Sequence, residues 1–327
     1  MGLRPVGLAL LALVVGACGS VTPSLAPPSP STPSPATPAA TTPAAPTSTE
    51  PSPAATDLVE DIDIGGRTMH LVCRGHANPG EPTIVLEAGL EEDSRTWDAI
   101  VGPMQSDHRL CAYDRAGVGQ SEPPVERSVT ATDHARDLRA LLDAAGVVGP
   151  YVLVSQSYGA AVAIVFTHAN PDDVAGLLFV DPRTPWTSAR FRAVLPKPAK
   201  DEPDGLVQLR FSLDSFETDP LLNHEDLSLG RSYEEAAAAL DGAAPAFGDR
   251  PVVVLSAGIS LGAELGLPPD LAKKTDEIWA EDHRELAGES TNGSVETVPG
   301  AGHMIQIDRP QAVIEALEGI LGDLATP

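Results

Sequence analysis

The sequence predicts an α/β fold with a mostly parallel sheet and helices on both faces, and two observations lead to this prediction. Apolar, strand-like runs alternate with helix-period segments from Asp57 onward, which is the order that builds parallel sheets. The run Tyr151–Val154 leads into Ser155-Gln156-Ser157-Tyr158-Gly159 and then into small apolar residues. Strand, sharp turn and helix around a central serine are typical of a nucleophile elbow.

Each expected element follows from a local pattern. Leu58–Ile64 and Arg67–Cys73 flank Gly65-Gly66, a hairpin signal. Thr132–Ala145 has helix-period leucines and is closed by Gly146. Further strands are expected at Thr83–Glu87, Leu110–Tyr113, Tyr151–Val154, Gly176–Val180, Val252–Leu255 and Val295–Val298, and the last helix at Gln311–Leu324.

Residues 183–248 interrupt this alternation. They hold several prolines and helix-prone stretches such as Ser232–Leu240, without a comparably strong strand. Long insertions inside a compact domain are usually functional lids. We therefore expect a helical lid or cap over 183–248 within a domain of residues 57–327; a disordered insertion is the alternative.

Residues 1–17 predict an export signal. Arg4 gives a positive start, and Leu8–Val15 is apolar but too short to span a bilayer permanently. Val15-Gly16-Ala17-Cys18 resembles the lipobox of bacterial lipoproteins, whose cysteine becomes the lipidated first residue. A plain secretory signal is the alternative. In both cases we expect the mature protein to leave the cytoplasm, either anchored in the cell envelope through Cys18 or secreted.

Composition describes the next segment and excludes one class of partner. Eleven prolines lie among Ser, Thr and Ala between residues 21 and 56, with Glu50 as the single charge. Such a stretch buries too little apolar surface to order itself, so residues 18–56 are expected to be an extended tether. The net charge of −25 argues against nucleic acid, which requires a basic surface.

Three residues with catalytic chemistry follow expected strands in the order Ser157, Asp181 and His303. Ligands of parallel sheets bind at the carboxyl ends of strands. A serine hydroxyl is a weak nucleophile without a base, and an imidazole can both accept and return a proton. We therefore predict Ser157 as nucleophile and His303 as base. The acid that orients the histidine is Asp181 or, alternatively, Glu264.

These motifs resemble the α/β-hydrolase superfamily over about residues 57–327, and especially its secreted single-domain hydrolases with S-Y-G elbows. The matching segments are Val85–Leu90, Tyr113–Ser121, the elbow and Pro299–His303. The chain departs from the usual pattern at Ser155, at Glu87-Ala88 and in lacking an Asp soon after Leu255.

The resemblance implies further roles. The superfamily most often places the acid after the penultimate strand, where this chain offers only Glu264, whereas Asp181 occupies a position that some members use. Backbone N–H groups of Leu90 and Tyr158 would form the oxyanion hole. The family strand order puts the second strand beside the fourth, so Cys73 and Cys111 are expected to form a disulfide in an oxidising compartment.

The predicted function is a serine hydrolase that needs no cofactor or metal and acts on a neutral ester, amide, peptide-like or lipid-like small molecule. We expect it to be a monomer. An acyltransferase with the same residues and a non-catalytic binding lipoprotein are the alternatives. Asp114 and Arg115 are interpreted as holding the Ala116–Ser121 turn. Four aromatic residues line the acyl pocket or pack in the core: Trp97, Tyr158, Trp186 and Phe191.

Overall fold

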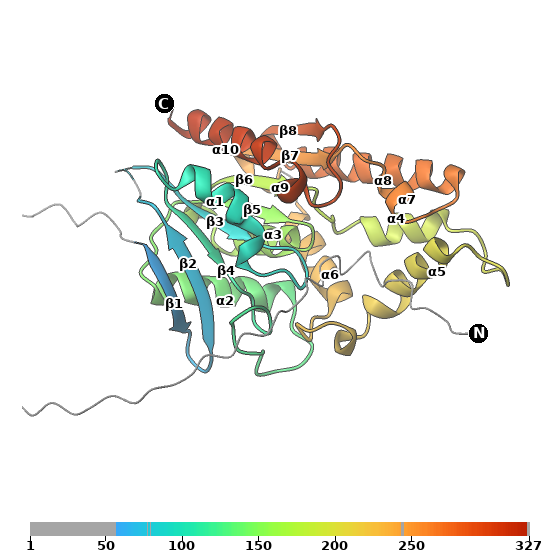
Figure 1. Cartoon of the computed structure of the whole chain (residues 1–327), viewed down its shortest axis with the longest axis horizontal. Coiled ribbons are helices and arrows are strands. Elements are labelled where there is room, and N and C mark those ends of the chain that lie inside the picture. The colour runs from blue at the N-terminus through green and yellow to red at the C-terminus, as the bar shows by residue number, and fades with distance from the viewer. Residues whose placement is uncertain (1–56, 77, 79, 243–244, 326–327) are drawn as a thin grey trace, which may run out of the picture.

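The computed structural model describes residues 57–327 apart from 77, 79, 243, 244, 326 and 327 (Figure 1). The predicted signal (1–17), the predicted lipidation site Cys18 and the expected tether (18–56) lie outside the described residues. Within the described part, no helix combines the length and the apolar character that crossing a membrane requires.

One mixed sheet of eight strands forms the centre of the domain, in the order β1-β2-β4-β3-β5-β6-β7-β8. β1 and β2 form an antiparallel hairpin, β2 pairs antiparallel with β4, and all further pairs are parallel. The predicted α/β fold is confirmed. The strands are β1 Leu58–Asp63, β2 Thr68–Arg74, β3 Thr83–Glu87, β4 Leu110–Tyr113, β5 Tyr151–Gln156, β6 Val174–Val180, β7 Gly248–Ala257 and β8 Ser290–Val298.

Helices cover both faces of this sheet because successive side chains of its central strands point in opposite directions. In β3, Val85 packs into one core cluster with α2 (Ala131–Ala144) and α3 (Gly159–Ala169). Its neighbours Ile84 and Leu86 pack into the other, with α1 (Asp98–Met104) and α10 (Pro310–Ala325). Figure 1 shows α2 and α10 on opposite sides of the sheet.

The last two strands of the chain, β7 and the edge strand β8, are longer than expected. β7 extends the predicted run Val252–Leu255 at both ends, and β8 extends Val295–Val298 toward its amino end. The added residues are mostly polar or charged, such as Arg250 and Asn292. β8 is an edge strand with mostly exposed or half-buried residues, so its sequence carries little of the apolar signal that marks the buried strands.

The segment between β6 and β7 is helical over most of its described length. It contains α4 (Thr187–Val194), α5 (Asp204–Phe211), a π-helical turn Ser212–Phe216, a 3₁₀ turn Pro220–Leu222 and α6 (Leu229–Leu240). The expected helix Ser232–Leu240 lies within α6. In Figure 1 these helices gather beside one end of the sheet, away from β1.

Sequence reasoning missed α8 (Pro269–Ala287), the longest helix of the domain. Phe191 of α4 packs on Trp279 of α8, together with apolar residues of α5 and of the short helix α7 (Leu261–Glu264). α8 thus ties the inserted segment to the carboxyl-terminal half of the sheet.

The predicted disulfide is present. Cys73 and Cys111 are direct partners in the register of β2 and β4, and their sulfur atoms are bonded at 2.03 Å. Both residues are completely buried. The bridge therefore fastens the amino-terminal hairpin to the interior of the sheet.

Candidate active site

Ser157 lies on the tight turn between β5 and α3, with a φ of 51°. The turn brings α3 close to the loop after β3, because a Cβ added at Gly159 would lie 2.7 Å from the carbonyl oxygen of Ala88. Ser155, which stands where the superfamily usually has glycine, is completely buried. Ser155 and Gly159, the small residues on either side of Ser157, therefore allow the close approach of strand and helix that the sequence predicted.

His303 reaches Ser157 from the loop between β8 and α9 (Ile305–Asp308). Its Nε2 lies 2.9 Å from the Ser157 Oγ. The loop is anchored at its backbone: the side-chain amide of Gln156 donates to the His303 carbonyl at 3.1 Å, and the Gly302 N–H donates to Asp308 at 2.8 Å. The imidazole therefore faces the hydroxyl from a fixed position.

Asp181 directly follows β6 and lies behind the imidazole. One carboxylate oxygen, Oδ2, is 2.7 Å from His303 Nδ1. The other, Oδ1, accepts the backbone N–H of Ala257 at 2.8 Å and the indole N–H of Trp279 at 3.0 Å. Asp181 is 1% exposed, so both oxygens have partners in the protein interior.

The charges around His303 favour the protonated form of its imidazole. Burial alone would raise the pKa of Asp181, but the hydrogen bond and charge of His303, with His283 and the Ala257 N–H, hold that pKa below its usual value. Burial would lower the pKa of His303, yet Asp181, with Glu92 and Glu264, raises it above its usual value. These pKa shifts favour an ionised Asp181, which would stabilise an imidazolium if Ser157 transferred its proton to His303.

Glu264, the alternative acid, lies elsewhere. It ends α7, and its carboxylate lies against the backbone of Gly302 and His303 rather than at Nδ1. Glu92 also contributes charge near the imidazole, and burial raises the pKa of its carboxyl. The structure therefore joins Asp181 to His303 and places Glu264 next to the histidine main chain.

The two predicted oxyanion donors lie next to Ser157 in the chain and on the loop against which its turn packs. Tyr158 follows Ser157 in the chain, and Leu90 lies in the loop after β3, against which the elbow packs. Within the described part of the chain, neither backbone N–H donates to a protein acceptor. Both groups are therefore free to donate to a bound atom, as an oxyanion hole requires.

Sequence reasoning did not identify the residues around Asp181. Trp279 donates to Asp181 and packs edge-on against His303, with ring centres 6.0 Å apart. His283, one turn further along α8, is fully buried between Ser256 and the Pro182 carbonyl. The apolar period of α8 could have predicted a helix, but no local signal indicates contact with a residue 98 positions earlier.

The four aromatic candidates are mainly packing residues. Trp97 is completely buried in the cluster below α1 and α10, and Tyr158 contacts His134 and Tyr233. Phe191 packs on Trp279, and Trp186 stacks with Arg190. The core interpretation therefore fits Trp97 and Tyr158, and the other two pack at the inserted segment.

Asp114 and Arg115 both contribute to the turn Ala116–Ser121, as expected, but in different ways. Asp114 holds the following turn by accepting the Gln120 N–H at 2.8 Å. Arg115 contributes its backbone carbonyl, which accepts the Val118 N–H at 3.0 Å. Its guanidinium is directed elsewhere, to Glu87, Glu225 and the backbone of Ala88 and Gly89. The unusual Glu87 is therefore one of its two ion-pair partners.

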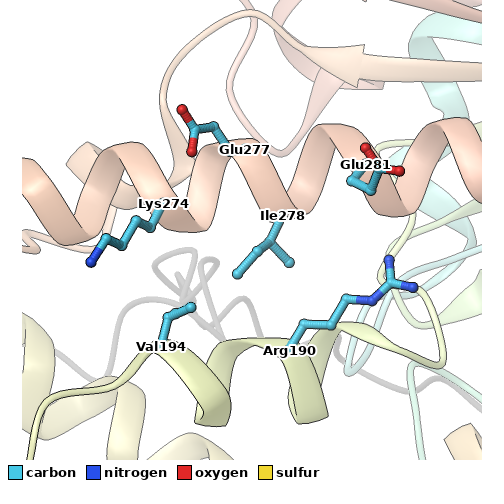
Figure 2. Close-up of a pocket in the computed structure, with 6 residues that line it drawn as sticks. All are labelled: Arg190, Val194, Lys274, Glu277, Ile278 and Glu281. Atoms are coloured by element: carbon cyan, nitrogen blue, oxygen red, sulfur yellow. The ribbon is translucent and has the colours of Figure 1, made fainter.

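A separate hollow of about 280 Å³ lies between α4 and α8 (Figure 2). It contains none of the three hydrogen-bonded residues described above. Its lining is partly charged and partly apolar, with Arg190 engaged by Asp282 and Glu285. The lining residues are Arg190, Val194, Lys274, Glu277, Ile278 and Glu281.

Comparison with known proteins identifies the family. Residues 84–316 match the model of the alpha/beta hydrolase family, and the chain belongs to that family. An esterase from Thermogutta terrifontis has the same fold, with a TM-score of 0.56 over 83% of this chain and 100% of the esterase, at 20% identity.

Curated relatives match only in part. "Lipase LipV" of Mycobacterium tuberculosis is 35% identical over 36% of this chain and 44% of its own length. "Probable transporter efuK" of Hormonema carpetanum is 25% identical over 80% of this chain, which spans 42% of that protein. The chain thus covers less than half of either relative.

Proposed function

We propose that the protein is a serine hydrolase that cleaves a neutral ester or an amide or peptide-like acyl substrate through an acyl-enzyme on Ser157. The observation that carries the proposal is the continuous hydrogen-bonded chain from the Ser157 hydroxyl through His303 to Asp181. In this role His303 removes the hydroxyl proton as the oxygen attacks the acyl carbon, and then delivers it to the leaving group.

The remaining parts of the reaction have candidate residues. The backbone N–H groups of Leu90 and Tyr158 would stabilise the negative oxygen of the tetrahedral intermediate. A second cycle with water as nucleophile would release the acid and regenerate Ser157. The likeness to a lipase over part of the chain supports ester chemistry, and a serine at the elbow argues against reactions that require an aspartate nucleophile there.

Two alternatives make different predictions. An acyltransferase would form the same acyl-enzyme but pass the acyl group to an alcohol. A non-catalytic binding protein on this fold would form no acyl-enzyme at all, since fold alone does not establish activity. Among the described residues, neither alternative has a distinct structural feature in its favour.

We further propose that the enzyme acts at the cell envelope, anchored through a lipidated Cys18 and held away from the membrane by residues 18–56. The lipobox-like sequence supports this placement. The buried Cys73–Cys111 bridge supports an oxidising compartment.

A fluorophosphonate probe tests the chemical proposal directly, because it reacts with an activated serine. The parent should be labelled on Ser157 and should hydrolyse p-nitrophenyl esters, and the chain-length preference in a panel of such esters would define the acyl group. Ser157→Ala should lose labelling and at least about 10⁴-fold in kcat. Ser155→Ala is the matched control, because it removes a buried hydroxyl without a protein partner two residues away. An unlabelled, inactive parent, or labelling that survives Ser157→Ala, would refute the proposal.

A further inference from the structure

Arg115 is a cation without access to solvent, 1% exposed, beneath the loop that follows β3. Burying a charge is costly unless ion pairs and hydrogen bonds compensate for it. Its Nη1 donates to Glu87 Oε1 at 2.6 Å, and its Nε and Nη2 donate to the two carboxylate oxygens of Glu225 at 2.7 and 2.8 Å. Two acidic residues from distant parts of the chain thus converge on one guanidinium.

The same guanidinium also binds the backbone of the loop. Nη1 donates to the Ala88 carbonyl at 2.6 Å, and Nη2 donates to the Gly89 carbonyl. The Gly89 carbonyl belongs to the same peptide group as the Leu90 N–H. In a planar trans peptide these two groups point in opposite directions. Arg115 therefore turns the Leu90 N–H away from the buried guanidinium, and its charge polarises that peptide toward a stronger donor.

Glu225 fixes the next peptide of the loop. Its Oε1 accepts the backbone N–H of Glu91 at 2.6 Å. The Glu91 side chain in return accepts the backbone N–H of His224 at 2.9 Å, and Glu91 adopts the left-handed conformation with a φ of 59°. Such a conformation persists in a non-glycine residue only when its surroundings hold it. The peptides on both sides of Leu90 are thus fixed, one by Arg115 and the other by Glu225.

We propose that Arg115 and Glu225 are positioning residues for the oxyanion hole: together they set and polarise the peptide whose N–H, at Leu90, stabilises the tetrahedral intermediate. This inference rests on the proposed serine hydrolase function. It gives the inserted segment a part in the chemistry. Glu225 belongs to that segment, whereas its partners Glu91 and Arg115 lie on the loop after β3 and beyond β4. The Glu87 of the chain, which departs from the superfamily pattern, completes the binding site for the guanidinium.

The test compares Arg115→Lys and Glu91→Ala with the parent, using ester hydrolysis and inhibition by an alkyl boronic acid. A boronic acid adds to the serine as a tetrahedral anion and so reports on the oxyanion hole. Lysine keeps the charge but cannot reach both carbonyls and Glu225 at once. Removal of one oxyanion donor costs about 10²–10³-fold in kcat, so a displaced donor in Arg115→Lys should cost at least about tenfold. We expect KM to change less than about threefold and boronate affinity to fall in parallel with kcat.

Glu91→Ala keeps the test decisive if Arg115→Lys does not fold, because Glu91 is partly exposed and its loss leaves no buried charge unpaired. It should lower kcat and boronate affinity together, by several-fold. Arg250→Lys is the matched control, since Arg250 binds the carbonyls of Pro171, Val174 and Phe247 at the amino-terminal ends of β6 and β7. It should lose stability while keeping kcat.

The outcomes separate the inference from the function on which it rests. A parent without esterase activity or boronate inhibition would refute the hydrolase proposal itself. An active parent whose folded Arg115→Lys and Glu91→Ala variants keep its kcat and boronate affinity would overturn the positioning role alone. Variants that differ from the parent only in KM or in melting temperature would also overturn the positioning role.

Discussion

Replacing Asp181 by asparagine should abolish most activity through a tautomer change that the structure specifies. Oδ1 accepts two hydrogen bonds, from Ala257 N–H and Trp279 Nε1. An amide can accept there only with its oxygen, so the NH₂ group of the introduced asparagine must take the Oδ2 position, 2.7 Å from His303 Nδ1. It would donate to Nδ1 and leave the imidazole proton on Nε2, which faces the Ser157 hydroxyl.

The expected magnitude follows from this geometry. A histidine protonated on Nε2 cannot accept the serine proton, and this change alone costs about 10⁴-fold in kcat in the comparable substitution of a serine protease. That factor corresponds to about 5.4 kcal/mol of transition-state stabilisation. Because Ser157, His303 and the proposed oxyanion donors all stay in place, KM should change little, and the amide preserves the buried contacts of Oδ1.

Steady-state kinetics on a p-nitrophenyl ester, with melting temperatures for both proteins, would measure this effect. Glu264→Gln is the matched control: it makes the same chemical change in a carboxylate next to the His303 backbone and should stay within about tenfold of the parent, because it leaves the tautomer unchanged. If Asp181→Asn kept more than a tenth of the parental kcat, the tautomer argument would be refuted. A larger loss in Glu264→Gln than in Asp181→Asn would assign the acid to α7.

Two further predictions concern pH and stability. The pKa of His303 lies above its usual value because Asp181, Glu92 and Glu264 outweigh the effect of burial. Since the proposed reaction requires the neutral imidazole, kcat/KM should fall as the pH drops through that raised pKa. Glu264→Gln should move this acid limb of the pH profile to lower pH by less than about one unit, and a limb that moves upward or not at all would contradict the prediction. The Cys73–Cys111 bridge closes a loop with a sequence separation of 38. The double Cys→Ala variant should therefore lose about 4 kcal/mol of unfolding free energy, measured by urea titration. A loss below about 1 kcal/mol would show that the bridge constrains the unfolded chain little.

The sequence predicts the buried part of the sheet well because both faces of those strands are covered. β3 and β4 have the expected bounds and consist entirely of buried residues. β8 was only half found, since an edge strand with exposed side chains tolerates Thr, Asn and Glu. α8 was missed although its buried residues, such as Leu271, Trp279 and Leu286, recur at helical spacing. The hydrophobic pattern of a sequence thus reflects which side chains are buried, and this signal is weaker in an element whose side chains are mostly exposed.

Some residues of the candidate site can be predicted from local sequence motifs, whereas others depend on contacts between distant parts of the chain. Ser157 and its small neighbours are visible in five consecutive residues, and His303 follows a recognisable Gly-rich loop. The partners of Asp181 and of Arg115 could not be found from sequence, because Trp279 and Glu225 lie about a hundred positions away. No local rule links a carboxylate to an indole or a guanidinium at such a separation.

The position of Asp181, the proposed acid, is consistent with the arrangement of neighbouring strand ends. β6 and β7 are adjacent and parallel, with Val180 beside Leu255 in register, so residues that follow either strand emerge at the same edge. Asp181 takes up the space between them: its N–H donates to the Leu255 carbonyl at 2.8 Å, and its carboxylate accepts from Ala257 at the end of β7. The end of β7 therefore contributes a backbone donor close to where the superfamily most often places the carboxylate, and Trp279 of α8 supplies the second donor. An acid that follows β6 instead of β7 still reaches His303, because both strands end at the same edge and these two donors hold its carboxylate there.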